Sequence, residues 1–259
     1  MLFIGDIIGP TGRAAIQRFV PELRRELRLD AVVANGENSA DNGFGITIPI
    51  AESLLQFVDF LTLGDHAFDQ EEIGVFLDRD TRIVRPLNFE GDKPGRGWGM
   101  FRVGDVTVGV ANVLGRLFMR PAVRPPYAAA DRAVQELKAA GANCILVDMQ
   151  AEATSEKVGM GWHLDGRATA VLGTHTHVPT ADLRILPGGT AYVSDVGMTG
   201  GKDSIIGFDR AHFLDFMSGG DRSRPPAPAG VPARLDAVLI EVDVASGKAV
   251  LVERVVREG

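Results

Sequence analysis

The chain has 259 residues, of which 45% are hydrophobic and 24% are charged. This composition is typical of a globular protein with a sizeable core. The formal net charge of −7 argues against a broad binding surface for duplex DNA or RNA. A small nucleotide held through metal ions is compatible with that charge, because a bound cation reverses the local sign.

Cysteine content and apolar runs indicate a cytoplasmic protein without a membrane partner. The single cysteine, Cys144, lies in an apolar run and can form no internal disulfide, so we expect a small core residue there. No run reaches the roughly 18–20 apolar residues of a membrane span. Gly5-Asp6 interrupts the N-terminal apolar run almost at once, which does not fit a secretory signal.

Short apolar runs alternate with segments of helical period through the first third of the chain. In the first such segment, apolar residues at positions 16, 20, 23 and 27 share one helical face. Strand–helix–strand alternation of this kind predicts a largely parallel sheet covered by helices. We expect strands at 2–6, 31–34, 60–63 and 82–84, and helices at 11–27 and 48–58.

Antiparallel pairing is predicted in the middle and at the end of the chain. Gly104-Asp105 separates apolar runs at 100–103 and 106–113, which predicts a hairpin. The segment 218–233 is rich in proline and glycine and is expected to be a surface loop. We therefore expect residues 1–259 to form a single domain. Further expected elements are a helix at 128–140, strands at 144–149 and 170–173, and a second hairpin at 237–244 and 249–256.

Polar side chains follow the predicted strands at five places. Ligands of parallel α/β sheets bind outside the carboxyl ends of the strands, so these side chains are expected to converge on one rim. Each group also has a purely structural interpretation, as a helix cap for the aspartates or as a turn. The residues are Asp6, Glu37 with Asn38, Asp65 with His66, Gln150, and His175 with His177.

The histidine pair carries the most information. A spacing of two on an extended chain would point the imidazoles of His175 and His177 to the same face, as co-ligation requires, although a structural pair is the alternative. His163 and His212 lack such a setting and are expected to be structural. The glycines between positions 5 and 12 resemble a phosphate-binding loop but lack the ending of a P-loop.

Together these carboxylate, amide and imidazole groups indicate a dinuclear metal centre. Such ligands suit Mn, Fe or Zn. Two ions about 3.5–4 Å apart lower the pKa of a bridging water and hold both oxygens of an in-line phosphoryl displacement. A histidine that does not ligate can then protonate the leaving oxygen.

Seven segments resemble one known family. They are Gly5-Asp6-Ile7-Ile8-Gly9 with Gly12-Arg13, Asn35-Gly36-Glu37-Asn38-Ser39-Ala40, Thr62-Leu63-Gly64-Asp65-His66, Arg85-Pro86-Leu87-Asn88, Ala151-Glu152-Ala153-Thr154-Ser155-Glu156-Lys157, residues 173–182 and residues 194–200. On these segments the chain resembles the YmdB-like branch of the calcineurin-like metallophosphoesterases, up to about Gly207. The resemblance implies an α/β fold, a four-layer α/β/β/α sandwich with mixed sheets. It also implies a homo-oligomer and a dinuclear centre whose bridging hydroxide hydrolyses phosphodiesters such as 2′,3′-cyclic nucleotides.

The resemblance also assigns roles by motif. It implies that Glu37 bridges the two ions, that His175 binds the second ion, and that His66 is the proton donor. The remaining ligands of the first ion would be Asp6, Asn38 and His177.

Two positions of the second ion depart from the family pattern. The family has asparagine where this chain has Asp65, and histidine where it has Gln150. Asp65 can still ligate and adds negative charge, whereas Gln150 offers a neutral amide oxygen. That oxygen is a poorer partner than imidazole for Fe or Zn. We therefore expect Mn or Mg at the second site, with Mn favoured, or weak occupancy.

Three functions follow from these residues. The first is a phosphodiesterase acting on a small phosphodiester or nucleotide. The second is a phosphomonoesterase, which the same centre would support with a different pocket shape. The third is a catalytically attenuated regulatory protein that binds a nucleotide or metal, an option raised by Asp65 and Gln150 and opposed by the retention of His66. Arg116 is either a phosphate contact or an ordinary surface residue.

Overall fold

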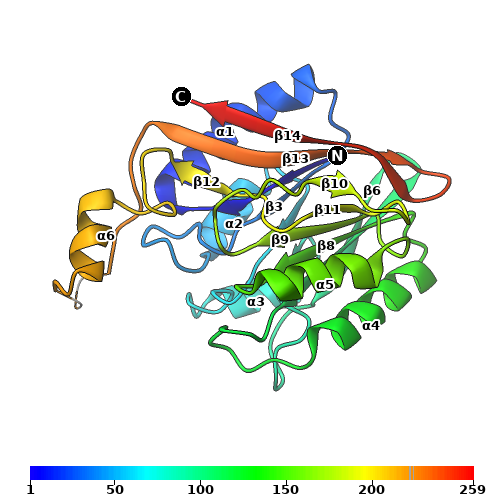
Figure 1. The fold of residues 1–259 in the computed structure, drawn as a ribbon, viewed down its shortest axis with the longest axis horizontal. Coiled ribbons are helices and arrows are strands. Elements are labelled where there is room, and N and C mark those ends of the chain that lie inside the picture. Colours follow the sequence, from blue (N-terminus) through cyan, green and yellow to red (C-terminus); the bar gives the residue numbers. More distant parts are fainter. Residues whose placement is uncertain (222, 224) are drawn as a thin grey trace.

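The computed structural model describes residues 1–221, 223 and 225–259. Two mixed sheets pack face to face in it (Figure 1). The first sheet contains β1 (Leu2–Ile4), β2 (Asp6–Ile7), β3 (Val32–Asn35), β4 (Phe60–Thr62), β5 (Ile83–Val84), β12 (Met198–Gly201), β13 (Ala233–Asp243) and β14 (Lys248–Glu258). The second contains β6 (Trp98–Val103), β7 (Val106–Leu114), β8 (Cys144–Gln150), β9 (Ala170–Thr174), β10 (Arg184–Ile185) and β11 (Ala191–Val193).

Strand order explains how distant segments meet. In the first sheet, β1, β3, β4 and β5 are parallel, and β13 pairs antiparallel with β1. The C-terminal hairpin of β13 and β14 thereby joins the sheet that the N-terminal strand begins. In the second sheet, β7, β8, β9 and β11 are parallel, with β6 and β10 antiparallel at the two edges. Both predicted hairpins are confirmed.

Helices cover the outer face of each sheet. On the first sheet lie α1 (Gly9–Glu26), α2 (Ile48–Leu54) and α3 (Ile73–Arg79), and on the second lie α4 (Pro126–Ala139) and α5 (Thr154–Leu164). The predicted apolar face of α1 is confirmed, because Ile16, Val20 and Leu23 are fully buried. The order helices, sheet, sheet, helices confirms the expected four-layer α/β/β/α sandwich.

Between the two sheets lies an apolar layer that holds their relative position. Phe3, Phe60 and Leu146 are fully buried in it, and the ring of Phe60 stacks on that of Phe101 with centroids 5.6 Å apart. Along its length, this apolar layer packs the inner face of one sheet against the inner face of the other. The packing therefore fixes the distance between the strand ends that carry polar side chains.

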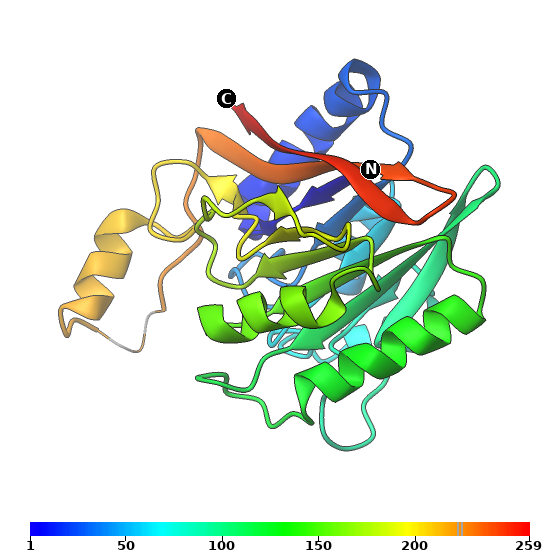
Figure 2. The same ribbon diagram turned by 45° about the vertical axis from the view of Figure 1, so that its right-hand side comes forward.

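Some elements were not predicted from the sequence. In α5, Glu156 and Lys157 are buried, which interrupts the apolar pattern that marks a helix. The helix α6 (Arg210–Met217) has no buried residue and projects away from the sheets (Figure 2). It has no apolar face packed on a core, so its sequence lacks the usual helical signal.

In the segment 218–233, where a surface loop is expected, the described residues before β13 form neither helix nor named strand. Residues 222 and 224 lie outside the described part of the chain. No described helix has the length and apolar character needed to cross a membrane. That residues 1–259 form one domain stays a prediction, and the pairing of β13 with β1 supports it.

Replacing Phe60 by alanine tests the layer between the sheets. Phe60→Ala should lower the free energy of unfolding by about 3–5 kcal/mol, because it opens a cavity between two sheets. Val75→Ala is the control, since Val75 is 72% exposed. Urea denaturation measures both. A loss at Phe60 no larger than that at Val75 would contradict the packing described here.

Candidate metal centre

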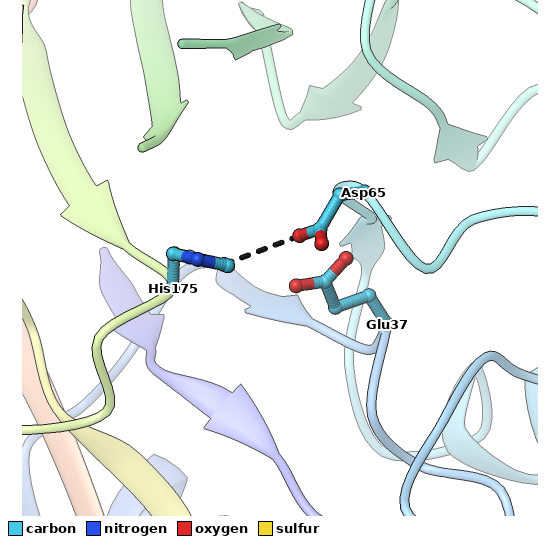
Figure 3. Close-up of side chains that lie close together, drawn as sticks. All are labelled: Glu37, Asp65 and His175. Atoms are coloured by element: carbon cyan, nitrogen blue, oxygen red, sulfur yellow. Dashed lines mark ion pairs between the residues drawn. The ribbon is translucent and has the colours of Figure 1, made fainter. Parts of the chain in front are cut away.

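The carboxyl ends of strands from both sheets meet at one rim. Glu37 follows β3, Asp65 follows β4 and His175 follows β9. Figure 3 shows their side chains pointing toward one another, and each offers a ligand atom within 4.8 Å of the others. Asp65 Oδ1 lies 3.1 Å from His175 Nδ1. The predicted convergence is therefore observed for these three, and together they could hold a metal ion.

A glycine permits this close approach. A Cβ atom on Gly64 would lie 2.2 Å from Glu37 Oε2 and 2.6 Å from the side-chain amide of Gln150. Any larger residue would displace one of these groups. The absence of a side chain at Gly64 is thus a requirement of the site.

A second group of side chains lies beside the first. His177 Nε2 is 3.9 Å from Asp6 Oδ1, and Asn38 Nδ2 donates to the carbonyl of Gly43 at 2.9 Å. His177 Nδ1 lies 2.8 Å from the carbonyl of Ile206. Because a carbonyl only accepts, Nδ1 carries the proton and Nε2 keeps its lone pair. Nε2 is the nitrogen that a metal ligand needs.

Two buried oxygens in this group lack a hydrogen-bond partner. Within the described part of the chain, nothing donates to Asp6 Oδ1 or to Asn38 Oδ1. Leaving such an atom unpaired costs about 1–3 kcal/mol. A cation beside Asp6, Asn38 and His177 would satisfy both oxygens, and this donor set suits a divalent first-row metal. The residues therefore fit the metal that the sequence predicts.

Burial shifts the protonation of these groups. Burial, together with the Asp195 carboxylate, raises the pKa of Asp6 to about 7, and burial with Asp65 nearby raises the pKa of Glu37 well above its ordinary value. Burial lowers the pKa of His177 to about 4, which keeps its imidazole neutral. The site thus brings together buried carboxylates whose negative charge the described residues do not fully neutralise.

Asp65 and His175 behave as a pair. Burial alone would raise the pKa of Asp65 and lower that of His175. The hydrogen bond and charge between them outweigh burial, so the pKa of Asp65 falls to about 2 and that of His175 rises. The Asp65 carboxylate and the His175 imidazole therefore each favour the charged form of the other.

The histidine segment is not extended, which corrects the geometric argument made from its spacing. β9 ends at Thr174, and His175 and His177 adopt left-handed backbone conformations with φ of +92° and +64°. Such conformations cost about 1–3 kcal/mol for non-glycine residues. His175 faces Asp65, while His177 faces Asp6. His175 therefore belongs to one group of candidate ligands, and His177 belongs to the neighbouring group.

A buried ion pair holds this segment. Lys157 Nζ lies 2.9 Å from Asp195 Oδ2, with side chains 3% and 0% exposed. The same oxygen accepts from the backbone nitrogen of Thr176 at 3.1 Å and from its hydroxyl at 2.6 Å. The ion pair was not predicted, because the sequence does not indicate which lysine or aspartate is buried.

His66 borders the opening of the site. Its backbone nitrogen donates to Glu37 Oε2 at 3.0 Å, and its Nδ1 lies 2.7 Å from Asp69 Oδ2. The ring packs against Phe44 with centroids 5.0 Å apart. A cavity of about 290 Å³ lies here. Its lining residues include Glu37, Asn38, Phe44, His66, Glu152, His175, His177 and Phe208.

The helix ends exclude the helix-cap interpretation of the two aspartates. The cap position of α1 is Ile8 and that of α3 is Glu72, so neither Asp6 nor Asp65 caps a following helix. His163 lies 2.9 Å from Asp131 and does not line the cavity, as expected for a structural residue. Arg116 does not line the cavity either.

Beneath the rim, polar side chains link the two sheets. Asp148 of β8 accepts from Asn35 Nδ2 at 3.0 Å and from Thr62 Oγ1 at 2.6 Å, both on the first sheet, and from Thr174 Oγ1 at 2.6 Å. Burial raises the pKa of Asp148 to about 7. Gln150, two residues further along β8, lies among Glu37, Asp65 and His175.

A family model described as YmdB-like protein matches residues 2–255. The chain belongs to the YmdB-like family. It is 42% identical to the 2′,3′-cyclic-nucleotide 2′-phosphodiesterase of Bacillus subtilis over 98% of this chain and 96% of that protein.

Solved structures extend the comparison of this YmdB-like protein. A phosphatase from Mycoplasma pneumoniae matches with a TM-score of 0.91 and 31% identity, covering 99% of this chain and 92% of that one. A 5′-nucleotidase precursor from Thermus thermophilus matches with a TM-score of 0.52 and 14% identity, covering 99% of this chain and 54% of that one. The second likeness shows a shared fold.

Removing the lysine of the buried ion pair tests how the histidine segment is held. Lys157→Met should lower the free energy of unfolding by about 3–5 kcal/mol, because it leaves the Asp195 carboxylate buried without its cation. Lys202→Met, which removes the exposed partner of Glu258, should change stability little. Urea denaturation compares the two. Equal small effects would show that the buried pair does not hold the segment.

Proposed function

We propose that this YmdB-like protein hydrolyses small phosphodiesters, with 2′,3′-cyclic nucleotides as the substrate class, at a centre of metal ions. The observation that carries the proposal is the pair of buried oxygens without donors, Asp6 Oδ1 and Asn38 Oδ1, beside the neutral His177. The relative from Bacillus subtilis, named for that diesterase activity, supports the choice of substrate.

We assign the ligands as two overlapping sets. We assign Glu37 to both, because the carboxylates of Asp65 and Asp6 both lie close enough to raise its pKa. The first ion would be held by Asp6, Asn38 and His177, and the second, for which we favour Mn, by Asp65, His175 and the amide oxygen of Gln150. Bound ions would lower the pKa of a water molecule and neutralise charge on the phosphoryl oxygens.

His66 is positioned to move a proton. The Asp69 carboxylate accepts from Nδ1 and fixes the imidazole, while Phe44 packs against the ring. The other nitrogen, Nε2, lies 3.7 Å from Asp65 Oδ2. When the imidazole carries both protons, Nε2 would give its proton to the leaving oxygen of the ester. The cavity, at about 290 Å³, lies at the small end of the range for small-molecule sites.

Our proposal also includes the location and the assembly that the sequence leads us to expect. We propose a cytoplasmic homo-oligomer whose partners are small phosphodiesters or nucleotides, without duplex nucleic acid or membrane. The net charge of −7 supports the exclusion of duplex nucleic acid.

Hydrolysis of three substrates tests the proposed reaction. The purified protein should cleave bis-p-nitrophenyl phosphate and a 2′,3′-cyclic nucleotide when Mn²⁺ is added, and lose both activities in EDTA. Cleavage of p-nitrophenyl phosphate alone would indicate a phosphomonoesterase. No turnover of any of the three would indicate a regulatory protein, and either outcome would contradict the proposal.

Replacing His66 by alanine tests the proton donor. His66→Ala should lower kcat for the cyclic nucleotide about 10²–10⁴-fold, as expected when a general acid is lost. Metal content should be unchanged, because His66 is not among the proposed ligands. His163→Ala serves as the control, since His163 pairs with Asp131. An unchanged kcat in His66→Ala would remove His66 from the proposed mechanism.

A further inference from the structure

The amide of Gln150 faces the proposed second ion site with its nitrogen. Gln150 Nε2 donates to Glu37 Oε1, and it lies 3.4 Å from Asp65 Oδ1 and 3.2 Å from His175 Nδ1. It therefore contacts all three residues of the cluster that could hold a metal ion. An amide nitrogen has no lone pair available for a metal, and its hydrogens carry partial positive charge.

The side-chain amide of Asn35 sets the orientation of the Gln150 amide. The backbone nitrogen of Glu37 donates to Asn35 Oδ1 at 3.0 Å. Because a backbone N–H can only donate, the oxygen of Asn35 must lie on that side, and Nδ2 must point the other way. Asn35 Nδ2 then donates to Asp148 at 3.0 Å and to the carbonyl of Leu63 at 3.3 Å.

Gln150 adopts the orientation that Asn35 dictates. Gln150 Oε1 lies 3.3 Å from Asn35 Nδ2 and also contacts the hydroxyl of Thr174. Turning the Gln150 amide over would place its nitrogen against Asn35 Nδ2, donor against donor. It would also place its oxygen against Glu37 and Asp65, acceptor against acceptors. Hydrogen bonding on both sides therefore selects the same orientation.

We propose that the Gln150 amide substitutes for the second cation in the resting protein. The inference rests on the proposed function, because it concerns occupation of that metal centre. The N–H₂ group lies between the carboxylates of Glu37 and Asp65 in place of an ion, while His175 Nδ1 lies 3.1 Å from Asp65 Oδ1. The second ion binds only when the amide turns or withdraws, which breaks its contact with Asn35. The first site, with Asp6, Asn38 and His177, does not require this change.

Stepwise binding follows from this arrangement. The first ion would meet oxygens to which no described residue donates. The second ion competes with a hydrogen-bonded side chain, so its dissociation constant is at least about tenfold larger, equivalent to ~1.4 kcal/mol. A histidine at position 150 would remove the competing donor and supply a ligand nitrogen.

The test is titration of EDTA-treated protein with Mn²⁺ by calorimetry, with metal analysis after gel filtration. Wild type should bind one equivalent tightly and a second at least about tenfold more weakly. Gln150→His should bring the second dissociation constant to within about threefold of the first. Gln150→Glu, of the same shape, should also tighten the second step, because it exchanges the donor for an anionic oxygen. Circular dichroism checks that each variant folds.

Gln17→His is the matched control, because Gln17 is exposed on α1 and the variant adds a histidine away from the site. It should bind Mn²⁺ as wild type does. Two equivalents of equal affinity in wild type would overturn the inference, as would an unchanged second step in Gln150→His.

Diester hydrolysis, measured on the same samples, separates this inference from the proposed function. Stepwise binding without hydrolysis would contradict only the proposed function. Hydrolysis with two equal sites would contradict only the inference. No binding of Mn²⁺ would contradict both.

Discussion

The hydrogen bond from Asn35 to Asp148 joins the two sheets directly beneath the metal centre. Apolar packing holds the sheets together over most of their contact, but it cannot set the orientation of polar groups at the rim. Asn35 does so, because one side of its amide is fixed by the backbone of Glu37 and the other reaches across to β8. The ligands that follow β3 and those that follow β8 and β9 are thereby placed relative to one another. Among the described residues, Asp6 Oδ1 and Asn38 Oδ1 are left buried without a donor, which favours a cation beside them.

Much of the fold and the location of the site could be predicted from the sequence. Apolar runs ending in polar residues placed Asp6, Glu37 and Asp65 at strand ends, and parallel strands bring such ends to one rim. The backbone of His175 and His177 was predicted wrongly, because left-handed conformations at non-glycine residues leave no pattern in the sequence. The buried pair of Lys157 and Asp195 was likewise missed. Both depend on contacts between segments far apart in the chain, which local periodicity does not encode.

Gln150 shows what the structure adds to a sequence comparison. By residue type alone, glutamine in place of histidine is a weaker ligand. In the structure its amide nitrogen is also a donor, held in that role by Asn35, and on our proposal it would oppose a second ion as well as failing to attract one. On the same proposal, an amide in place of an imidazole would weaken the second site and leave the contacts of Asp6, Asn38 and His177 in place.

The central claim is that unpartnered acceptors around Asp6 and Asn38 bind a cation while Gln150 holds the neighbouring position. Anomalous diffraction from crystals equilibrated with a limiting amount of Mn²⁺ tests it most directly. The account predicts a single peak bordered by Asp6, Asn38 and His177, with the amide nitrogen of Gln150 still hydrogen-bonded to Glu37. A peak bound by Asp65, His175 and Gln150 with none beside Asn38 would contradict it.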